Sequence, residues 1–189
     1  MSSAPHPFFT IGHSTRTVGQ LVELLRASDV QLVVDIRTVP RSRTNPQFNA
    51  DVLEETLRQS GIGYERIAEL GGLRGSSPDV PAAVNGFWQN RSFHNYADHA
   101  IGTSFREGLA RLRELGQAVP CAMMCAEAVW WRCHRRIVAD HLIATGETVC
   151  HILGPGKVEP ARLTEAARIA PDGTLTYPAD VRADGQNAD

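Results

Sequence analysis

The sequence lacks a long apolar run, because none approaches the roughly 20 residues that a membrane-spanning helix requires. Segment 1–7 lacks both the basic start and the apolar core of a signal peptide. We therefore expect a cytoplasmic protein with no membrane partner. The 189 residues carry no internal repeat and are within the range of one domain. We expect a single α/β domain over 1–189, with its core at about 8–170 and a C-terminal tail at 171–189.

Lysine is almost absent, since Lys157 is the only lysine among 19 basic residues. Arginine presents a planar fork that suits carboxylate and phosphate oxygens, although genomic composition can produce the same bias. The formal net charge is −2 at pH 7, so no global charge favours nucleic acid or a membrane surface. We therefore expect a small anionic ligand at a local site, and a nucleic-acid partner is not favoured. The sequence carries no signal for an oligomeric state.

Cysteine is also scarce, with four residues in the chain. Three of the four lie in or beside apolar runs, and a chain of this length does not need disulfides for stability. We therefore interpret all four as reduced thiols. Cys121 and Cys150 fit small buried hydrophobic residues, whereas Cys125 and Cys133 stand among charged residues and are candidates for chemistry.

Short apolar runs alternate with helical periodicity along the chain. Strands are predicted at 8–11, 31–36, 63–67, 121–125 and 148–153, and helices at 18–27, 49–61, 105–116, 133–145 and from Pro160 through Ala167. Segment 76–102 has few periodic signals and is expected to be an irregular excursion, while 174–177 can pair. This order predicts a three-layer, Rossmann-like α/β fold, in which helices cover both faces of a mostly parallel five-stranded sheet.

Polar residues follow the predicted strands where each strand ends. His13 and Ser14 follow the first strand, Asp35 and Arg37 close the second, and Cys125 and Glu127 come at the end of the fourth. In parallel sheets covered by helices, the loops at the carboxyl ends of the strands form the binding crevice. We therefore expect these side chains to meet at one edge of the sheet.

The first hypothesis is covalent catalysis by a thiolate. Cys133 is predicted near a helix N-terminus, where the helix dipole and its neighbours Arg132, His134 and Arg135 would lower its pKa. Cys125 is the competing nucleophile, with Glu127 or His13 as base. The expected reaction is hydrolysis or group transfer on a small substrate that carries phosphate or carboxylate.

Two other hypotheses remain open. A zinc or iron site would use Cys125, Glu127, Cys133 and His134; otherwise no cofactor is expected. On a helix, Cys133 and His134 would diverge by about 100°, so both could bind a metal only within a loop. A non-catalytic module would bind a nucleotide or a nucleic-acid end through loop arginines and stacked tryptophans. Those residues are Arg37, Arg41, Arg43, Arg132, Arg135, Trp130 and Trp131.

Several short motifs occur together in a recognisable order. They are 11–14 (Ile-Gly-His-Ser), 35–42 (Asp-Ile-Arg-Thr-Val-Pro-Arg-Ser), 48–49 (Phe-Asn), 70–72 (Leu-Gly-Gly), 95–97 (Asn-Tyr-Ala), 124–127 (Met-Cys-Ala-Glu) and 133–136 (Cys-His-Arg-Arg). On these residues the chain resembles the bacterial and archaeal domain of unknown function 488 family. The resemblance implies an enzyme without an assigned reaction.

The motifs and the strand-end positions together give one set of expected site residues. Catalytic roles are expected for Cys125, Glu127, Cys133, His13 and Asp35. Substrate-binding roles are expected for Ser14, Arg37, Arg41, Tyr96, Arg132, His134 and Arg135.

Overall fold

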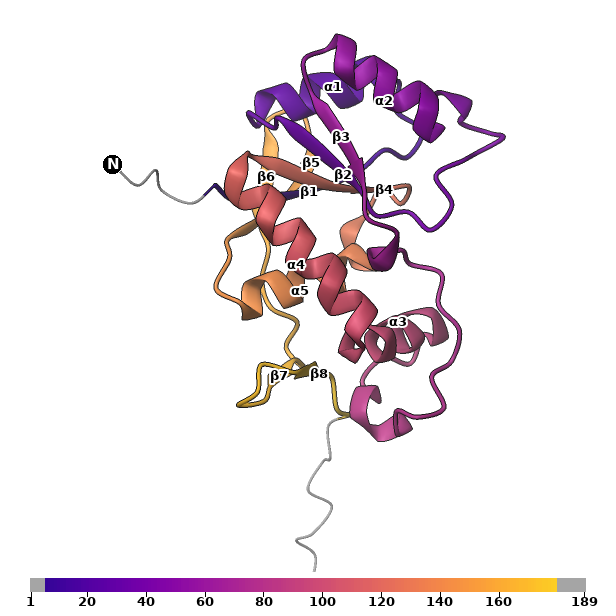
Figure 1. Ribbon diagram of the computed structural model, residues 1–189, viewed down its shortest axis with the longest axis vertical. Helices are drawn as coiled ribbons and strands as arrows, with labels where there is room; N and C mark the ends of the chain where they lie inside the picture. Colours follow the sequence, from indigo (N-terminus) through magenta and orange to yellow (C-terminus); the bar gives the residue numbers. More distant parts are fainter. Residues whose placement is uncertain (1–5, 180–189) are drawn as a thin grey trace, which may run out of the picture.

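The structure is a computed structural model that describes residues 6–179 (Figure 1). Its strands are β1 (Phe8–Gly12), β2 (Leu32–Asp35), β3 (Gly63–Arg66), β4 (Cys121–Cys125), β5 (Val149–Gly154), β6 (Lys157–Pro160), β7 (Arg168–Ile169) and β8 (Leu175–Thr176). Its α-helices are α1 (Val18–Ala27), α2 (Ala50–Gln59), α3 (Arg91–Ile101), α4 (Thr103–Ala118) and α5 (Arg135–Ala144). Residues 180–189 of the tail predicted at 171–189 lie outside the described residues.

The central sheet has six strands in the order β3-β2-β4-β1-β5-β6. The first five strands in this order run parallel, and β6 pairs antiparallel with β5 at the edge. The α/β prediction is therefore confirmed, with one strand more than expected. Strand β4 lies between β1 and β2, so the carboxyl ends of these three strands adjoin.

Helices cover both faces of this sheet, which gives three layers. Helices α1 and α2 pack on one face, and α3, α4 and α5 pack on the other (Figure 1). Side chains alternate across β4, because successive residues of a strand point to opposite faces. Met124 faces α1 and α2, whereas Cys121, Met123 and Cys125 face α4 and α5. The last residue of β4 therefore presents its thiol on the α5 side of the sheet.

The predicted helix end at Gly116 is wrong, because α4 continues to Ala118. Gly116 lies where α4 crosses the aromatic ring of Phe8, and a Cβ at this position would overlap that ring. The glycine therefore allows close helix–sheet packing and does not end the helix.

The predicted helix from Pro160 is also wrong. Pro155 and Gly156 form a two-residue turn, in which Gly156 has a φ of 65°, and the chain returns along β5 as β6. Pro160 ends this edge strand, where a missing N–H removes no inner hydrogen bond of the sheet. Residues 161–167 have no helix in the structure.

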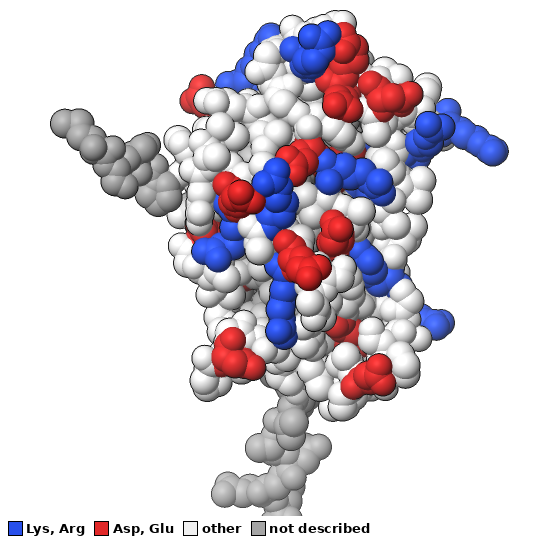
Figure 2. Space-filling model, in the orientation of Figure 1, with Lys and Arg blue, Asp and Glu red and all other residues white. Residues whose placement is uncertain are grey.

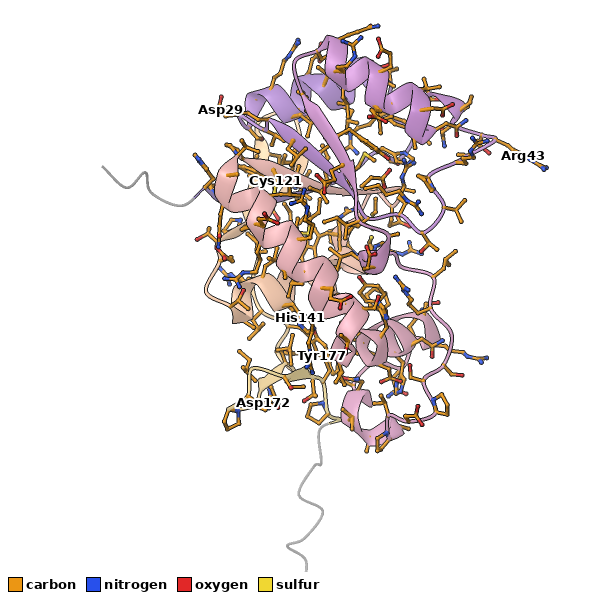
Figure 3. All side chains as sticks on the ribbon, in the orientation of Figure 1. Asp29, Arg43, Cys121, His141, Asp172 and Tyr177 are labelled. Atoms are coloured by element: carbon orange, nitrogen blue, oxygen red, sulfur yellow. The ribbon has the colours of Figure 1, made fainter. Side chains whose placement is uncertain are left out.

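Thr164 and Tyr177 fasten the last described segment to α5. The Thr164 amide donates to Asp140 Oδ1 at 2.9 Å, and the Tyr177 hydroxyl donates to Asp140 Oδ2 at 3.0 Å. Figure 3 shows Tyr177 below α5, beside the β7–β8 hairpin, which uses the predicted pairing segment at 174–177.

Helix α3 lies within the segment that was expected to be irregular. Asn90 caps it by accepting hydrogen bonds from the amides of Ser92 and Phe93. Its buried residues recur at helical spacing through Tyr96, Ala97 and Ala100.

Within the described range, no helix has both the length and the apolar character that crossing a membrane requires.

Candidate thiol site

A pocket of about 320 Å³ opens where β2 and β4 end. Three segments contribute most of its wall: the loop after β2, the first turn of α3, and the chain between β4 and α5. The lining residues are Arg37, Thr38, Val39, Gly72, Leu73, Ser92, Phe93, Cys125, Ala126, Glu127, Arg132, Cys133 and His134. The predicted crevice at the carboxyl ends of the strands is therefore present.

Cys125 and Cys133 meet at the base of this pocket. Cys125 is the last residue of β4, and the following loop, which contains a 3₁₀ helix at Trp130–Arg132, turns back before α5 begins. The two Sγ atoms are 2.7 Å apart, and both residues are free cysteines with at most 5% of their surface exposed. Gly12 makes the loop's path feasible, because a Cβ there would overlap the carbonyl of Glu127.

Arg135, in the first turn of α5, donates hydrogen bonds to the Cys125 sulfur and to two backbone carbonyls beside it. Its Nη1 donates to Cys125 Sγ at 2.6 Å and to the Glu127 carbonyl at 2.6 Å, and its Nη2 donates to the Ala128 carbonyl at 2.9 Å. The side chain is buried, and among residues 6–179 no carboxylate forms a salt bridge with it. A buried cation without a counter-charge is costly. A thiolate at Cys125 supplies that charge.

The two sulfurs differ in acidity. Burial raises the pKa of Cys125, but the hydrogen bond from Cys133 and the charge of Arg135 outweigh it and lower that pKa to about 7. Burial and the neighbouring Cys125 sulfur raise the pKa of Cys133 well above its usual value. Cys125 is therefore the more acidic of the two thiols, and Cys133 is the one placed to donate to it when Cys125 ionises.

The prediction of a lowered pKa at Cys133 is wrong. Helix α5 begins at Arg135 with His134 as its N-cap, so Cys133 precedes the helix in an extended conformation with φ −126°. Its own amide donates to the carbonyl of Trp130. Arg132, its neighbour in sequence, is exposed and does not contact the sulfur.

His134 is neutral and lies against Cys133. Its Nε2 is 2.9 Å from the Ile36 carbonyl, so Nε2 carries the proton and donates it there. The Nδ1 lone pair then faces Cys133 Sγ at 3.5 Å. Burial lowers the pKa of His134 to about 4, with a smaller contribution from the charge of Arg135. Gly72 leaves room for this ring, because a Cβ there would overlap it. We call Cys125, Cys133, His134 and Arg135 the dithiol cluster.

A second buried polar group lies on the α1 and α2 side of the same rim. Asp35 accepts from the Nε, Nη2 and amide of Arg37 and from the Tyr64 hydroxyl, at 2.5–3.1 Å. Arg37 Nη1 lies 3.3 Å from His13 Nε2, and the His13 ring stacks on Phe48 with centroids 4.1 Å apart. Burial lowers the pKa of His13. We call His13, Asp35, Arg37 and Tyr64 the aspartate cluster.

The structure brings some predicted substrate-binding residues to the pocket and not others. Arg37, Arg132 and His134 line it, as does the exposed Glu127. Four predicted substrate-binding residues do not line the pocket: Ser14, Arg41, Tyr96 and Arg135, which lies behind Cys125. Tyr96 is fully buried, and its hydroxyl donates to the Leu70 carbonyl at 2.7 Å.

The arginines proposed for a nucleic-acid module do not all lie at the pocket. Figure 3 shows Arg43 at the tip of its loop, pointing away from the molecule. Trp130 stacks on His151 with ring centroids 4.3 Å apart, so its face is already used for packing. On the face in Figure 2, both signs of charge are interspersed; on α4, for example, Arg111 pairs with Glu65 and Glu114.

A metal site would need three donors that converge. In the part of the chain that the structure describes, no group of three His, Cys, Asp or Glu residues is placed to hold a metal ion. Cys125 and Cys133 adjoin, but His134 Nε2 faces the Ile36 carbonyl and the Glu127 side chain is exposed. The described residues therefore offer no set of converging ligands for the zinc or iron hypothesis.

Some lining residues were not predicted from the sequence, Ser92, Phe93 and Leu73 among them. Ser92 and Phe93 belong to the first turn of α3. The signal was present: Asn90 precedes apolar residues at 93, 96, 97 and 100, which is capping followed by helical periodicity.

Fold and site together define an α/β domain with a buried cysteine pair and an arginine beside a pocket at its carboxyl rim. A family model described as Domain of unknown function DUF488 matches residues 17–142, which is more than half of the chain, and the chain belongs to this family. The match includes the whole dithiol cluster but not His13. Comparison with curated proteins and with solved structures gives no match.

Proposed function

We propose that the protein is a cysteine-dependent enzyme that hydrolyses a small anionic substrate or transfers a group from it, with Cys125 as nucleophile. One observation carries this proposal: the buried Arg135 guanidinium donates to Cys125 Sγ at 2.6 Å while that sulfur lines a pocket. A pKa lowered to about 7 gives Cys125 a substantial thiolate fraction at neutral pH, and the thiolate is the nucleophilic form.

The pocket supplies groups for the substrate's charge. Arg132 is exposed at its wall and is the cation we assign to the substrate's carboxylate or phosphate. Arg37 also lines the pocket, and its charge is shared with Asp35. Glu127 presents a carboxylate to the same space and is the residue we assign to activating water for hydrolysis.

The aspartate cluster has a positioning role in this proposal. Both nitrogens of His13 are engaged, Nδ1 with the Ser14 carbonyl and Nε2 with Arg37, and the Asp35 oxygens accept several hydrogen bonds. We therefore assign His13 and Asp35 to holding Arg37 at the pocket wall rather than to proton transfer.

Alkylation tests the nucleophile. With iodoacetamide at pH 7, we expect Cys125 of the folded protein to be carboxamidomethylated faster than Cys150, as mapped by peptide mass spectrometry. The Cys125→Ser variant should lose this fast phase while Cys150 reacts unchanged. Equal rates at Cys125 and Cys150 in the folded wild-type protein would contradict the proposal. Circular dichroism of both proteins controls for folding.

A further inference from the structure

The dithiol cluster contains a second sulfur that hydrolysis or group transfer does not use. Cys133 Sγ lies 2.7 Å from Cys125 Sγ, closer than two non-bonded sulfurs normally approach, and both residues line the pocket. Cys121 has no such partner: it is fully buried on β4 under α4 (Figure 3). The pair at the pocket is therefore a distinct feature of the chain.

The two sulfurs have the unequal roles that thiol–disulfide exchange requires. Cys125 is held as a thiolate by Arg135, and Cys133 remains a thiol whose hydrogen bond supports it. In such exchange a thiolate attacks first, and a neighbouring thiol then releases the product. The pocket gives an incoming molecule access to this pair.

His134 is placed to accept a hydrogen bond from the second thiol and to orient it. Its Nε2–H donates to the Ile36 carbonyl, which fixes the tautomer, and its free Nδ1 faces Cys133 Sγ. Gly72 permits the close approach of this ring. A purely structural thiol pair would need no such acceptor.

We propose that Cys125 and Cys133 form a redox-active dithiol that reduces small disulfides bearing carboxylates. This inference rests on the proposed function, because it uses the same thiolate. The carboxylates match the exposed Arg132, and the apolar wall formed by Val39, Leu73 and Phe93 accommodates the rest of the molecule.

The reaction balances in two steps. The Cys125 thiolate bonds to one sulfur of the substrate R–S–S–R′, the substrate S–S bond breaks, and R′–S⁻ leaves with the electron pair. Cys133 Sγ, oriented by its contact with the neutral His134 Nδ1, then bonds to Cys125 Sγ. The bond from Cys125 to the substrate sulfur breaks, and R–S⁻ leaves with the electron pair and takes the proton that Cys133 releases. The protein dithiol is oxidised by two electrons, and the substrate becomes two thiols once R′–S⁻ takes from water the proton that Cys125 had lost. A reducing dithiol closes the cycle by the reverse exchange.

A chromogenic disulfide tests the inference with the full chain. The probe is 5,5′-dithiobis(2-nitrobenzoate), which carries two carboxylates and releases coloured thionitrobenzoate, and Cys150→Ser serves as the background that removes the half-buried thiol. With one equivalent of probe at pH 7 without oxygen, we expect two thionitrobenzoates released and a protein mass lower by two hydrogen atoms. Cys133→Ser should release one and keep the other as an adduct on Cys125. Cys125→Ser should release thionitrobenzoate at least about 10-fold more slowly than the background protein.

The outcomes separate this inference from the proposed function. If the background protein keeps the adduct as Cys133→Ser does, the dithiol is not redox-active, while Cys125 still stands as nucleophile. If Cys125 neither releases the probe nor reacts with iodoacetamide, both proposals fail. If elemental analysis finds one zinc ion per chain, and the probe reacts only after a chelator removes it, the redox proposal is also overturned. Circular dichroism and urea midpoints verify that each variant is folded.

Discussion

The dithiol cluster and the aspartate cluster occupy the same rim but opposite faces of the sheet. In the aspartate cluster, the charges of Asp35 and Arg37 are matched, and the Tyr64 hydroxyl completes the hydrogen bonding. In the dithiol cluster, Arg135 is as deeply buried but finds only carbonyls and a sulfur. The comparison teaches that a buried arginine paired with a carboxylate stabilises the rim, whereas a buried arginine without a carboxylate lowers the pKa of the thiol beside it.

Removing the charge of Asp35 should produce the largest change in stability. Asp35→Asn leaves the buried Arg37 without its carboxylate, and we expect the free energy of unfolding to fall by about 3–5 kcal/mol. Urea denaturation measures this loss. If the clusters are distinct, the iodoacetamide rate of Cys125 in the folded variant stays near the wild-type rate.

Tyr64→Phe is the matched control, because it removes one hydroxyl donor and keeps the ion pair. Its expected loss is about 1 kcal/mol. A loss at Asp35→Asn no larger than that at Tyr64→Phe would contradict the view that the ion pair is the main stabilising contact.

Removing the charge of Arg135 should change reactivity most. The wild-type alkylation rate of Cys125 should rise with pH to a midpoint near 7, which is below the ordinary thiol value because Cys133 and Arg135 stabilise the thiolate. In Arg135→Met the midpoint should move to 9 or above, since burial then acts without the cation. At pH 7 the rate should fall by about 50-fold or more, because the thiolate fraction drops from about one half to about 1% when the pKa rises from about 7 to about 9.

Arg135→Lys controls for lost packing, because it keeps a charge but not the fork that reaches Cys125, Glu127 and Ala128 together. Its midpoint should lie between those of the wild-type protein and Arg135→Met. An unchanged midpoint in folded Arg135→Met would show that Arg135 does not stabilise the thiolate.

The sequence predicts those features of the two clusters that depend on residues close together along the chain, and it does not predict contacts between residues far apart. Asp35 and Cys125 end short apolar runs, so their places at strand ends followed from a local pattern. The acidity of Cys133 was mispredicted because adjacent residues in sequence, such as Arg132, need not face the same sulfur. The deciding contact joins Arg135 to Cys125 across a loop, and only the folded chain specifies it.

Elements outside the site show the same limit. The helix predicted at 18–27 is confirmed, and the capping box of Thr17 and Gln20 at its start joins residues only three positions apart. Proline suits both the first turn of a helix and an edge strand, so Pro160 alone does not distinguish the two. The Pro155–Gly156 turn, which pairs β6 with β5, makes it a strand residue. No sequence pattern predicts the contact of His13 with Phe48 or the hydrogen bond from Tyr64 to Asp35.

Crowding His134 should have an intermediate effect. Gly72→Ala places a Cβ against the imidazole ring, which the Ile36 carbonyl holds in place, so we expect a loss of about 1–3 kcal/mol in unfolding free energy. The second thionitrobenzoate release should slow while the first stays near the wild-type rate. Gly75→Ala is the control, because a Cβ there meets nothing within 4 Å. Equal stability of the two variants would contradict the tight packing of His134.

The smallest expected effect concerns the exposed cation at the pocket. Iodoacetate carries a carboxylate and iodoacetamide does not, so the ratio of their rates at Cys125 reports local attraction of anions. Arg132→Gln should lower this ratio by about 2- to 10-fold at low salt, and 1 M salt should remove most of the difference, because exposed charges are screened. Substitutions in the aspartate cluster should leave this ratio unchanged, since Arg132 forms no hydrogen bond or salt bridge with that cluster in the described residues. A ratio that is unchanged in Arg132→Gln but rises in Asp35→Asn, where Arg37 loses its neutralising carboxylate, would move the anion site to Arg37, and the two clusters would then share one ligand.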